Sequence, residues 1–255
     1  MKRAVSKDGT VIAYERHGDG PPLVLVGGAT CTHEADAPLA AELAAAHTVY
    51  VYDRRGRGES GDTTAYAVAR EVEDLAAVIA EAGGEAGVYG ISSGGALALE
   101  AAASGLPITR TAVYEVPYST DPAARADAYT AALGERLAAD DRGGAVELFL
   151  RRVGMPPEAV AGMRRAPFWK GLEALAPTLA HDDAVMGKGE VPAARLADIA
   201  QPVLVLCGGS SSQWFRDTGR VIAESAARGR YETLEGQDHQ VAPAVLAPVL
   251  REFFA

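Results

Sequence analysis

The stretch that decides the fold is Ala86–Leu99, which reads AGVYGISSGGALAL. Its first residues form a short apolar run that ends at Tyr89. The chain then turns through Gly90-Ile91-Ser92-Ser93-Gly94 and continues into alanine and leucine residues that favour a helix. We therefore expect a strand, a tight turn and a helix. The two elements would lie so close together at the turn that only glycine, which has no Cβ atom, fits at positions 90 and 94.

Ser92 is the residue at the apex of this G-x-S-x-G turn. A serine held in a strained turn before a helix is exposed to a substrate, and the free N–H groups of the helix N-terminus stabilise negative charge beside it. The pattern therefore makes Ser92 a candidate nucleophile. A plain glycine and serine turn before a helix fits the same five residues, so the rest of the chain has to decide.

Buried strands lie on both sides of this stretch. The apolar run Pro22–Val26 is continuous, which is typical of a strand covered on both faces, and Thr48–Tyr52 and Pro202–Cys207 repeat the pattern. Helical patterns such as Tyr66–Ala82 alternate with these strands. This alternation predicts an α/β fold with a mostly parallel central sheet of about eight strands flanked by helices.

Residues 118–199 depart from this alternation. The segment has a helical pattern with breaks at Gly143-Gly144 and Pro156-Pro157, and no strand pattern is evident in it. Strand patterns return at Pro202. We therefore predict an α/β core at 1–117 and 200–255 and a helical cap, or lid, inserted after the strand that ends near Glu115, the whole forming one structural unit. A separate small helical domain is the alternative.

The composition narrows the classes of partner. The 255 residues are 48% hydrophobic and 23% charged, as in ordinary globular proteins, and the net charge of −10 disfavours nucleic acid. No apolar run is long enough to span a membrane, and the basic start lacks the apolar run of a signal peptide. Cys31 and Cys207 are expected to be free thiols, which fits a cytoplasmic protein, and the richness in alanine and arginine suggests a bacterial source. We expect a monomer or homodimer that acts on a small molecule.

With these elements placed, the chain resembles the α/β-hydrolase fold superfamily over nearly its whole length, in particular serine esterases and haloperoxidase-like enzymes. The segment Asp53–Ser60 is similar to the D-x-R-G-x-G-x-S turn of these enzymes. The matching features occur in the family's order and are Leu23–Thr30, Asp53–Gly61, Gly90–Gly94, the helical insertion, Pro202–Gly209 and His239 near the C-terminus.

The resemblance implies a role for several residues. Ser92 would be the nucleophile and His239 the base that takes its proton. The backbone N–H groups of Ser93 and Ala29 would form the oxyanion hole, with Gly28 beside the substrate. The usual His-Gly pair of this loop is Gly27-Gly28 here, a departure that removes a side chain but keeps the main-chain donors.

The acid of the triad is the point at which the chain departs from the family. Related enzymes carry it after the strand that corresponds to Pro202–Cys207, but the loop Gly208–Trp214 holds no carboxylate. Some members take the acid from the end of the preceding strand, where this chain has Glu115. Asp217, or no acid at all, are the alternatives.

The remaining candidates concern the pocket and its surroundings. His33, Phe168, Trp169 and Trp214 would line a pocket for an apolar substrate, although the aromatic residues also suit a plain core. The arginines of the Asp53 turn would brace that turn rather than bind phosphate. The run His181-Asp182-Asp183 is interpreted as a solvated turn, since nothing completes a metal site around it. We expect no metal, no dinucleotide and no other cofactor.

These expectations combine into a hypothesis for the function. The chain would be a serine hydrolase that cleaves an ester, thioester or lactone of a small to medium apolar substrate through an acyl-enzyme on Ser92. One alternative is a cofactor-free haloperoxidase-like, C–C-cleaving or cyclising enzyme on the same fold. Another is a member that binds a small ligand without catalysis.

Overall fold

The structure is a computed structural model that describes residues 1–63, 66–120 and 127–255. Residues 121–126 of the predicted cap therefore lie outside the described residues. The described residues contain one sheet of eight strands. In chain order these are β1 (Lys2–Val5), β2 (Val11–His17), β3 (Pro22–Val26), β4 (Thr48–Tyr52), β5 (Ala86–Ile91), β6 (Ile108–Tyr114), β7 (Val203–Gly208) and β8 (Gly229–Leu234).

The strands follow one another in the order β1-β2-β4-β3-β5-β6-β7-β8. The pairs β1/β2 and β2/β4 are antiparallel, and every later pair is parallel. The predicted α/β fold with a mostly parallel sheet is thus confirmed. Because β3 to β8 are parallel, the loops after these strands meet at one edge of the sheet, and Ser92, Glu115 and His239 all lie in or beside these loops.

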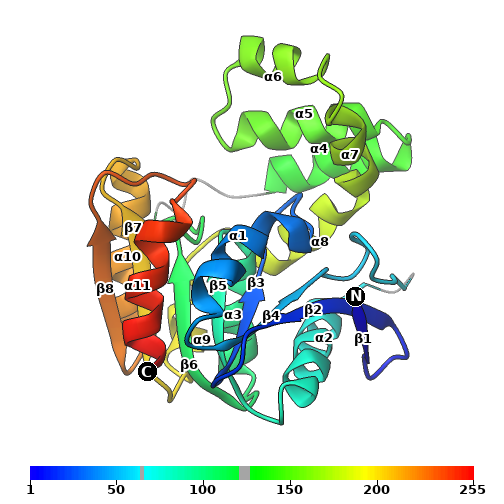
Figure 1. Ribbon diagram of the computed structural model, residues 1–255. Helices are drawn as coiled ribbons and strands as arrows, with labels where there is room; N and C mark the ends of the chain where they lie inside the picture. The colour runs from blue at the N-terminus through cyan, green and yellow to red at the C-terminus, as the bar shows by residue number, and fades with distance from the viewer. Residues whose placement is uncertain (64–65, 121–126) are drawn as a thin grey trace.

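Both faces of the sheet are covered, which explains the continuous apolar runs. Along β3, Leu23 and Leu25 pack on one face and Val24 and Val26 on the other. One face is covered by α1 (His33–Leu43) and α11 (Pro243–Phe254), which lie in front of the sheet in Figure 1. The other face carries α2 (Val68–Glu81), α3 (Ser93–Ala103) and α10 (Gln213–Ser225).

Between β6 and β7, the described residues form helices joined by turns and loops. We call these helices the helical insertion; they are α4 (Asp127–Ala138), α5 (Arg142–Arg152), α6 (Pro157–Met163), α7 (Trp169–Leu175), a 3-10 turn (Ala176–Thr178), α8 (Leu179–Met186) and α9 (Ala193–Leu196). In Figure 1, α4 to α7 stand beyond the carboxyl ends of the strands, and α8 lies closer to the sheet.

The helical insertion has a hydrophobic core of its own. Leu133 of α4, Val146 of α5 and Trp169 of α7 are buried together, apart from the two clusters that cover the sheet. Ala29, in the loop after β3, packs against this core. The helical insertion therefore touches the loop in which the oxyanion donor is expected.

None of the helices in the described ranges is both long and apolar enough to cross a membrane.

The close approach of α3 to the end of β3 leads to a test of the fold. A Cβ atom on Gly94 would collide with the main-chain oxygens of Val26 and Gly27, which cannot move without distorting β3. We expect Gly94→Ala to lower the free energy of unfolding by about 1–3 kcal/mol, as measured by urea denaturation followed by circular dichroism.

Gly134→Ala is the matched control for this substitution. Gly134 lies within α4, and nothing stands within 4 Å of the position that its Cβ would take. Alanine at an open helical position is expected to raise stability by about 0.5–1 kcal/mol. Equal stability of the two variants would contradict the close approach of α3 to the end of β3.

Candidate active site

Ser92 connects β5 directly to α3 and has φ 55° and ψ −128°. A positive φ is unfavourable for a residue with a side chain, so the surrounding structure has to hold it. The Ser92 N–H donates to the carbonyl of Tyr114, 2.9 Å away on the neighbouring strand β6. A Cβ atom on Gly90 would collide with the carbonyl of Gly94. The predicted strand, turn and helix are all present, with Ser92 at the apex.

Glu115 and His239 are in direct contact. The Nδ1 atom of His239 lies 2.8 Å from Oε2 of Glu115, whose side chain is completely buried. The second carboxylate oxygen, Oε1, accepts the N–H of Gly208 at 2.8 Å. An ionised carboxylate only accepts hydrogen bonds, so this contact assigns the proton of the imidazole to Nδ1 and leaves Nε2 with a free lone pair.

The imidazole of His239 is also held on its face. The ring of Phe215 stacks on it, with 5.4 Å between the ring centroids and 17° between the planes. The side chain of His239 nevertheless remains 44% exposed, so a substrate or water can reach it. Sequence reasoning missed Phe215, because one aromatic residue at the start of a helix carries no signal of a contact with a distant histidine.

The register of the sheet explains why these residues meet. Ile91 pairs with Tyr114, and Tyr114 pairs with Leu206, so β5, β6 and β7 end side by side. Ser92 and Glu115 are the next residues along their strands. Among the described residues, no hydrogen bond joins Ser92 to His239.

Asp217, the alternative acid, lies elsewhere. It is exposed on α10 and pairs with Arg220, with 3.0 Å between Oδ1 and the guanidinium nitrogen. Gln213 donates to the same carboxylate. The carboxylate that reaches His239 is Glu115.

The loop after β3 lies against Ser92. A Cβ atom on Gly28 would stand 3.2 Å from the Cβ atom of Ser92. Ala29 follows, half-buried, and Thr30 has φ 58°. Ser93 is the first residue of α3, so its N–H has no partner within the helix. The loop after β3 and the start of α3, which hold the two expected oxyanion donors, thus both adjoin Ser92.

The four side chains expected to line the pocket have different surroundings. His33 is bound to the turn after β4, since its Nδ1 lies 2.9 Å from Oδ1 of the buried Asp53. Trp169 is 4% exposed and belongs to the core of the helical insertion, whereas Phe168 is 54% exposed. Trp214 is 40% exposed and packs beside Phe215, 4.4 Å away between centroids. Of the four, Trp214 is the one that packs against Phe215, whose ring stacks on His239.

The interpretation of His181-Asp182-Asp183 as a solvated turn is wrong. The three residues belong to α8, and Asp182 is only 4% exposed. Its carboxylate pairs with the guanidinium groups of Arg54 and Arg57, each at 2.8 Å. Local sequence could not predict this burial, because the cations come from the turn after β4, more than 120 residues earlier.

The charges of this cluster are balanced. Arg54 also forms a buried pair with Glu71 of α2, with 2.7 Å between Nε and Oε2. Burial alone would raise the pKa of Asp182, but the guanidinium groups of Arg57 and Arg54 hold it below its usual range. The expectation that Arg54 and Arg57 brace their turn agrees with these contacts. We call Arg54, Arg57, Glu71, Asp182 and Ser93 the buried charge cluster.

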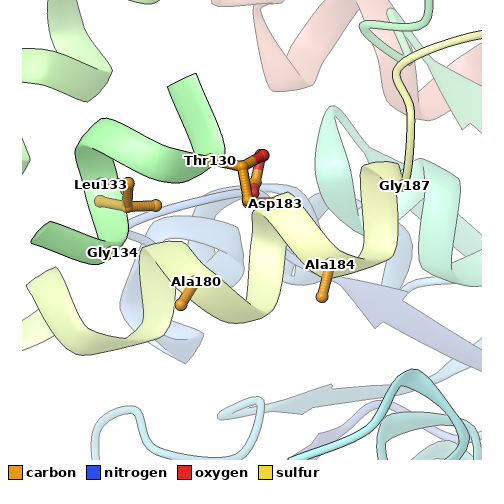
Figure 2. A pocket seen from close by; sticks show the side chains of 7 residues that line it. All are labelled: Thr130, Leu133, Gly134, Ala180, Asp183, Ala184 and Gly187. Atoms are coloured by element: carbon orange, nitrogen blue, oxygen red, sulfur yellow. The ribbon is translucent and has the colours of Figure 1, made fainter. Parts of the chain in front are cut away.

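A cavity of about 320 Å³ lies between α4 and α8. Figure 2 shows Thr130 of α4 next to Asp183 of α8, with Leu133 further along α4. Among the described residues that line it, neither Ser92 nor His239 appears. This cavity is therefore separate from the edge of the sheet that carries Ser92.

No group of three or more His, Cys, Asp or Glu side chains within the described residues is arranged to hold a metal ion. Of the two cysteines, Cys31 lies beside the loop after β3, and burial raises the pKa of its thiol to about 11. Burial likewise raises the pKa of the Cys207 thiol to about 12. Both thiols are thus protonated at neutral pH and are poor nucleophiles.

Comparison with known proteins agrees with the fold. A model of the alpha/beta hydrolase family matches residues 23–249. The crystal structure of an alpha/beta hydrolase from Sphaerobacter thermophilus is 54% identical, with a TM-score of 0.93 over 100% of both chains. No curated protein matches the chain.

Two more distant structures share the fold. A thermophilic esterase from Thermogutta terrifontis is 20% identical, with a TM-score of 0.78 over 99% of this chain and 97% of that one. An enol-lactonase from Burkholderia xenovorans is also 20% identical, with a TM-score of 0.72 and the same coverage.

A buried carboxyl group behind the loop after β3 is expected to make the free energy of unfolding depend on pH. Asp36 of α1 is buried, its Oδ2 would stand 2.9 Å from a Cβ atom on Gly27, and burial raises its pKa to about 6. A raised pKa favours the protonated form in the folded state, so the stability that it contributes is complete below pH 4 and is lost as the pH rises through 6.

Asp36→Asn removes this dependence. We expect the variant to match the wild type near pH 3–4 and to exceed its free energy of unfolding by about 2–3 kcal/mol at pH 8, as measured by urea denaturation across this range. Glu34→Gln changes an exposed carboxylate in the same helical turn and should leave the pH profile unchanged. Parallel profiles for wild type and Asp36→Asn would refute the assignment.

Proposed function

The chain belongs to the alpha/beta hydrolase family, and we propose that it is a serine hydrolase that cleaves esters, thioesters or lactones of small to medium apolar substrates. The observation that carries the proposal is the 2.8 Å contact between Nδ1 of His239 and the buried carboxylate of Glu115, beside a serine with positive φ. It supplies a base and an acid for Ser92. The names of the esterase and enol-lactonase neighbours are consistent with this class of substrate.

The proposed reaction begins when Nε2 of His239 takes the hydroxyl proton of Ser92 while Oγ bonds to the substrate carbonyl carbon. The carbonyl oxygen becomes an oxyanion and accepts the N–H groups of Ser93 and Ala29. The carbon–oxygen or carbon–sulfur bond to the leaving group then breaks, and His239 returns its proton to that group. The product of this half-reaction is an acyl-enzyme on Ser92.

The second half-reaction repeats these steps with water. His239 takes a proton from water, the hydroxide oxygen bonds to the acyl carbon, and the bond to Oγ of Ser92 breaks as His239 returns the proton. Throughout, Glu115 accepts a hydrogen bond from Nδ1–H of His239 and stabilises the imidazolium that forms at each step. The exposed edge of His239 is consistent with entry of water.

The helical insertion and the aromatic side chains suit the selection of substrates. Residues 118–199 act in this proposal as a cap beyond the sheet edge, with Phe168 and Trp169 in it and Trp214 beside His239. The exposed rings of Phe168 and Trp214 favour apolar acyl or alcohol groups.

Removal of the nucleophile tests the proposal most directly. We expect wild-type protein to hydrolyse nitrophenyl esters and to react covalently with a fluorophosphonate at Ser92. Ser92→Ala should lose both, with kcat falling by roughly 10⁵–10⁶-fold. Wild-type protein without ester turnover and without labelling would favour a non-catalytic ligand-binding role. Acetate-dependent halogenation without ester turnover would favour a haloperoxidase-like enzyme.

The acid is tested by a pair of neutralising substitutions. Glu115→Gln removes the charge that faces His239 and should lower kcat by about 10²–10⁴-fold, because the imidazolium loses its partner. Asp217→Asn removes an exposed charge on α10 and should leave kcat within a factor of about two. If the two variants behave in the opposite way, Asp217 is the acid, and if neither changes kcat, no acid is used.

A further inference from the structure

Asp182, on α8 of the helical insertion, lies at the centre of the buried charge cluster. Its Oδ1 atom accepts from Arg54, Arg57 and the hydroxyl of Ser93, at 2.8, 2.8 and 2.7 Å. Its Oδ2 atom accepts a second hydrogen bond from Arg57 at 2.8 Å. Asp182, Arg57 and Ser93 are each at most 4% exposed. The carboxylate is thus fixed by four hydrogen bonds from three residues, all of which belong to the α/β core.

Arg57 connects Asp182 to the loop after β3. Its Nη1 atom donates to the carbonyl of Gly28 at 2.5 Å, while Nη2 holds Asp182. The Gly28 carbonyl and the Ala29 N–H belong to one planar trans peptide, so they point in opposite directions. Fixing the oxygen therefore fixes the direction of the Ala29 N–H, which is the oxyanion donor in the proposed function.

Ser93 connects Asp182 to the second donor. The hydroxyl of Ser93 is bound to Asp182, and its own N–H is the first at the N-terminus of α3. Ala29 also packs against the core of the helical insertion. One carboxylate thus restrains both residues whose N–H groups would face the oxyanion.

We infer that Asp182 is a positioning residue for the oxyanion hole, acting through Arg57 on the Gly28–Ala29 peptide and through the hydroxyl of Ser93 on the start of α3. The inference rests on the proposed function, and it makes the oxyanion hole dependent on the helical insertion. The carboxylate of Asp182 both docks α8 onto the α/β core and restrains the two N–H donors. The donors are therefore aligned only when α8 is docked.

The turn after β4 contains a matched control for this role. Arg55 forms a buried bidentate pair with Asp74 of α2, at 2.7 and 2.6 Å, and is as buried as Arg57. Its hydrogen bonds go to Asp8, Thr63, Asp74 and the carbonyl of Arg70, away from Gly28 and Ser93. A loss of stability common to any buried arginine will therefore appear in both Arg55 and Arg57 variants, whereas a loss of alignment will appear only in the Arg57 variant.

The experiment compares Arg57→Lys with Arg55→Lys in the full chain. Lysine keeps the charge but lacks the planar fork that reaches two acceptors at once. We expect Arg57→Lys to lower kcat for a nitrophenyl ester by about 10–100-fold while KM changes by less than about threefold. Affinity for a trifluoromethyl ketone, which forms an oxyanion on bonding to Ser92, should fall by the same factor. Arg55→Lys should keep kcat and this affinity within about threefold.

A second substitution covers the case in which Arg57→Lys fails to fold. Ser93→Ala keeps the backbone N–H and removes only the hydroxyl bound to Asp182; it should fold and lower kcat and the ketone affinity together by about 3–10-fold. Unchanged kcat in Ser93→Ala and in folded Arg57→Lys, with an active wild type, would overturn the positioning role alone. Equal losses in Arg55→Lys and Arg57→Lys would also overturn it. A wild type without ester turnover would overturn the proposed function, and the positioning role with it.

Discussion

The buried carboxylate of Glu115 constrains the whole carboxyl edge of the sheet. An ionised carboxylate without solvent is strongly unfavourable unless it is paired and hydrogen-bonded. Here one oxygen accepts the N–H of Gly208 and the other meets the imidazole of His239. Since Glu115 follows β6, Gly208 ends β7 and His239 follows β8, a single side chain holds three strand ends in register. The position of the proposed base is thus a consequence of satisfying a buried acid.

The burial of four charged side chains in the buried charge cluster has a different physical reason. Arg54, Arg57, Glu71 and Asp182 contribute two positive and two negative charges, all nearly without solvent. Buried ion pairs of this kind gain about as much from attraction as they lose by desolvation, so apolar side chains would give similar stability. Apolar side chains cannot, however, fix the direction of a peptide carbonyl. The guanidinium group of Arg57 fixes the carbonyl of Gly28 in one orientation, and apolar side chains would lack this geometric role.

The fold could be predicted from the sequence because each element carries its own pattern. The run Pro22–Val26 alternates between the two faces of the sheet, and both faces are buried, so its apolar character is continuous. The contact between Glu115 and His239 could also be anticipated, because the order of parallel strands brings their loops together. Asp182 could not be placed in this way. Its run of charges is typical of a solvated surface, and its arginine partners stand in the turn after β4, more than 120 residues away.

The imidazole of His239 has one neighbour from the end of β6 and another from the helix that follows β7. Glu115 reaches Nδ1 of His239 from the end of β6, while the loop Gly208–Trp214 holds no carboxylate and the first turn of α10 brings Phe215 onto the face of the imidazole. The two neighbours act on different parts of the ring. The carboxylate sets the tautomer at its edge, and the negative π-face of the aromatic ring favours positive charge above it. Both therefore hold the imidazole of His239 in place, Glu115 through Nδ1 and Phe215 across the face of the ring.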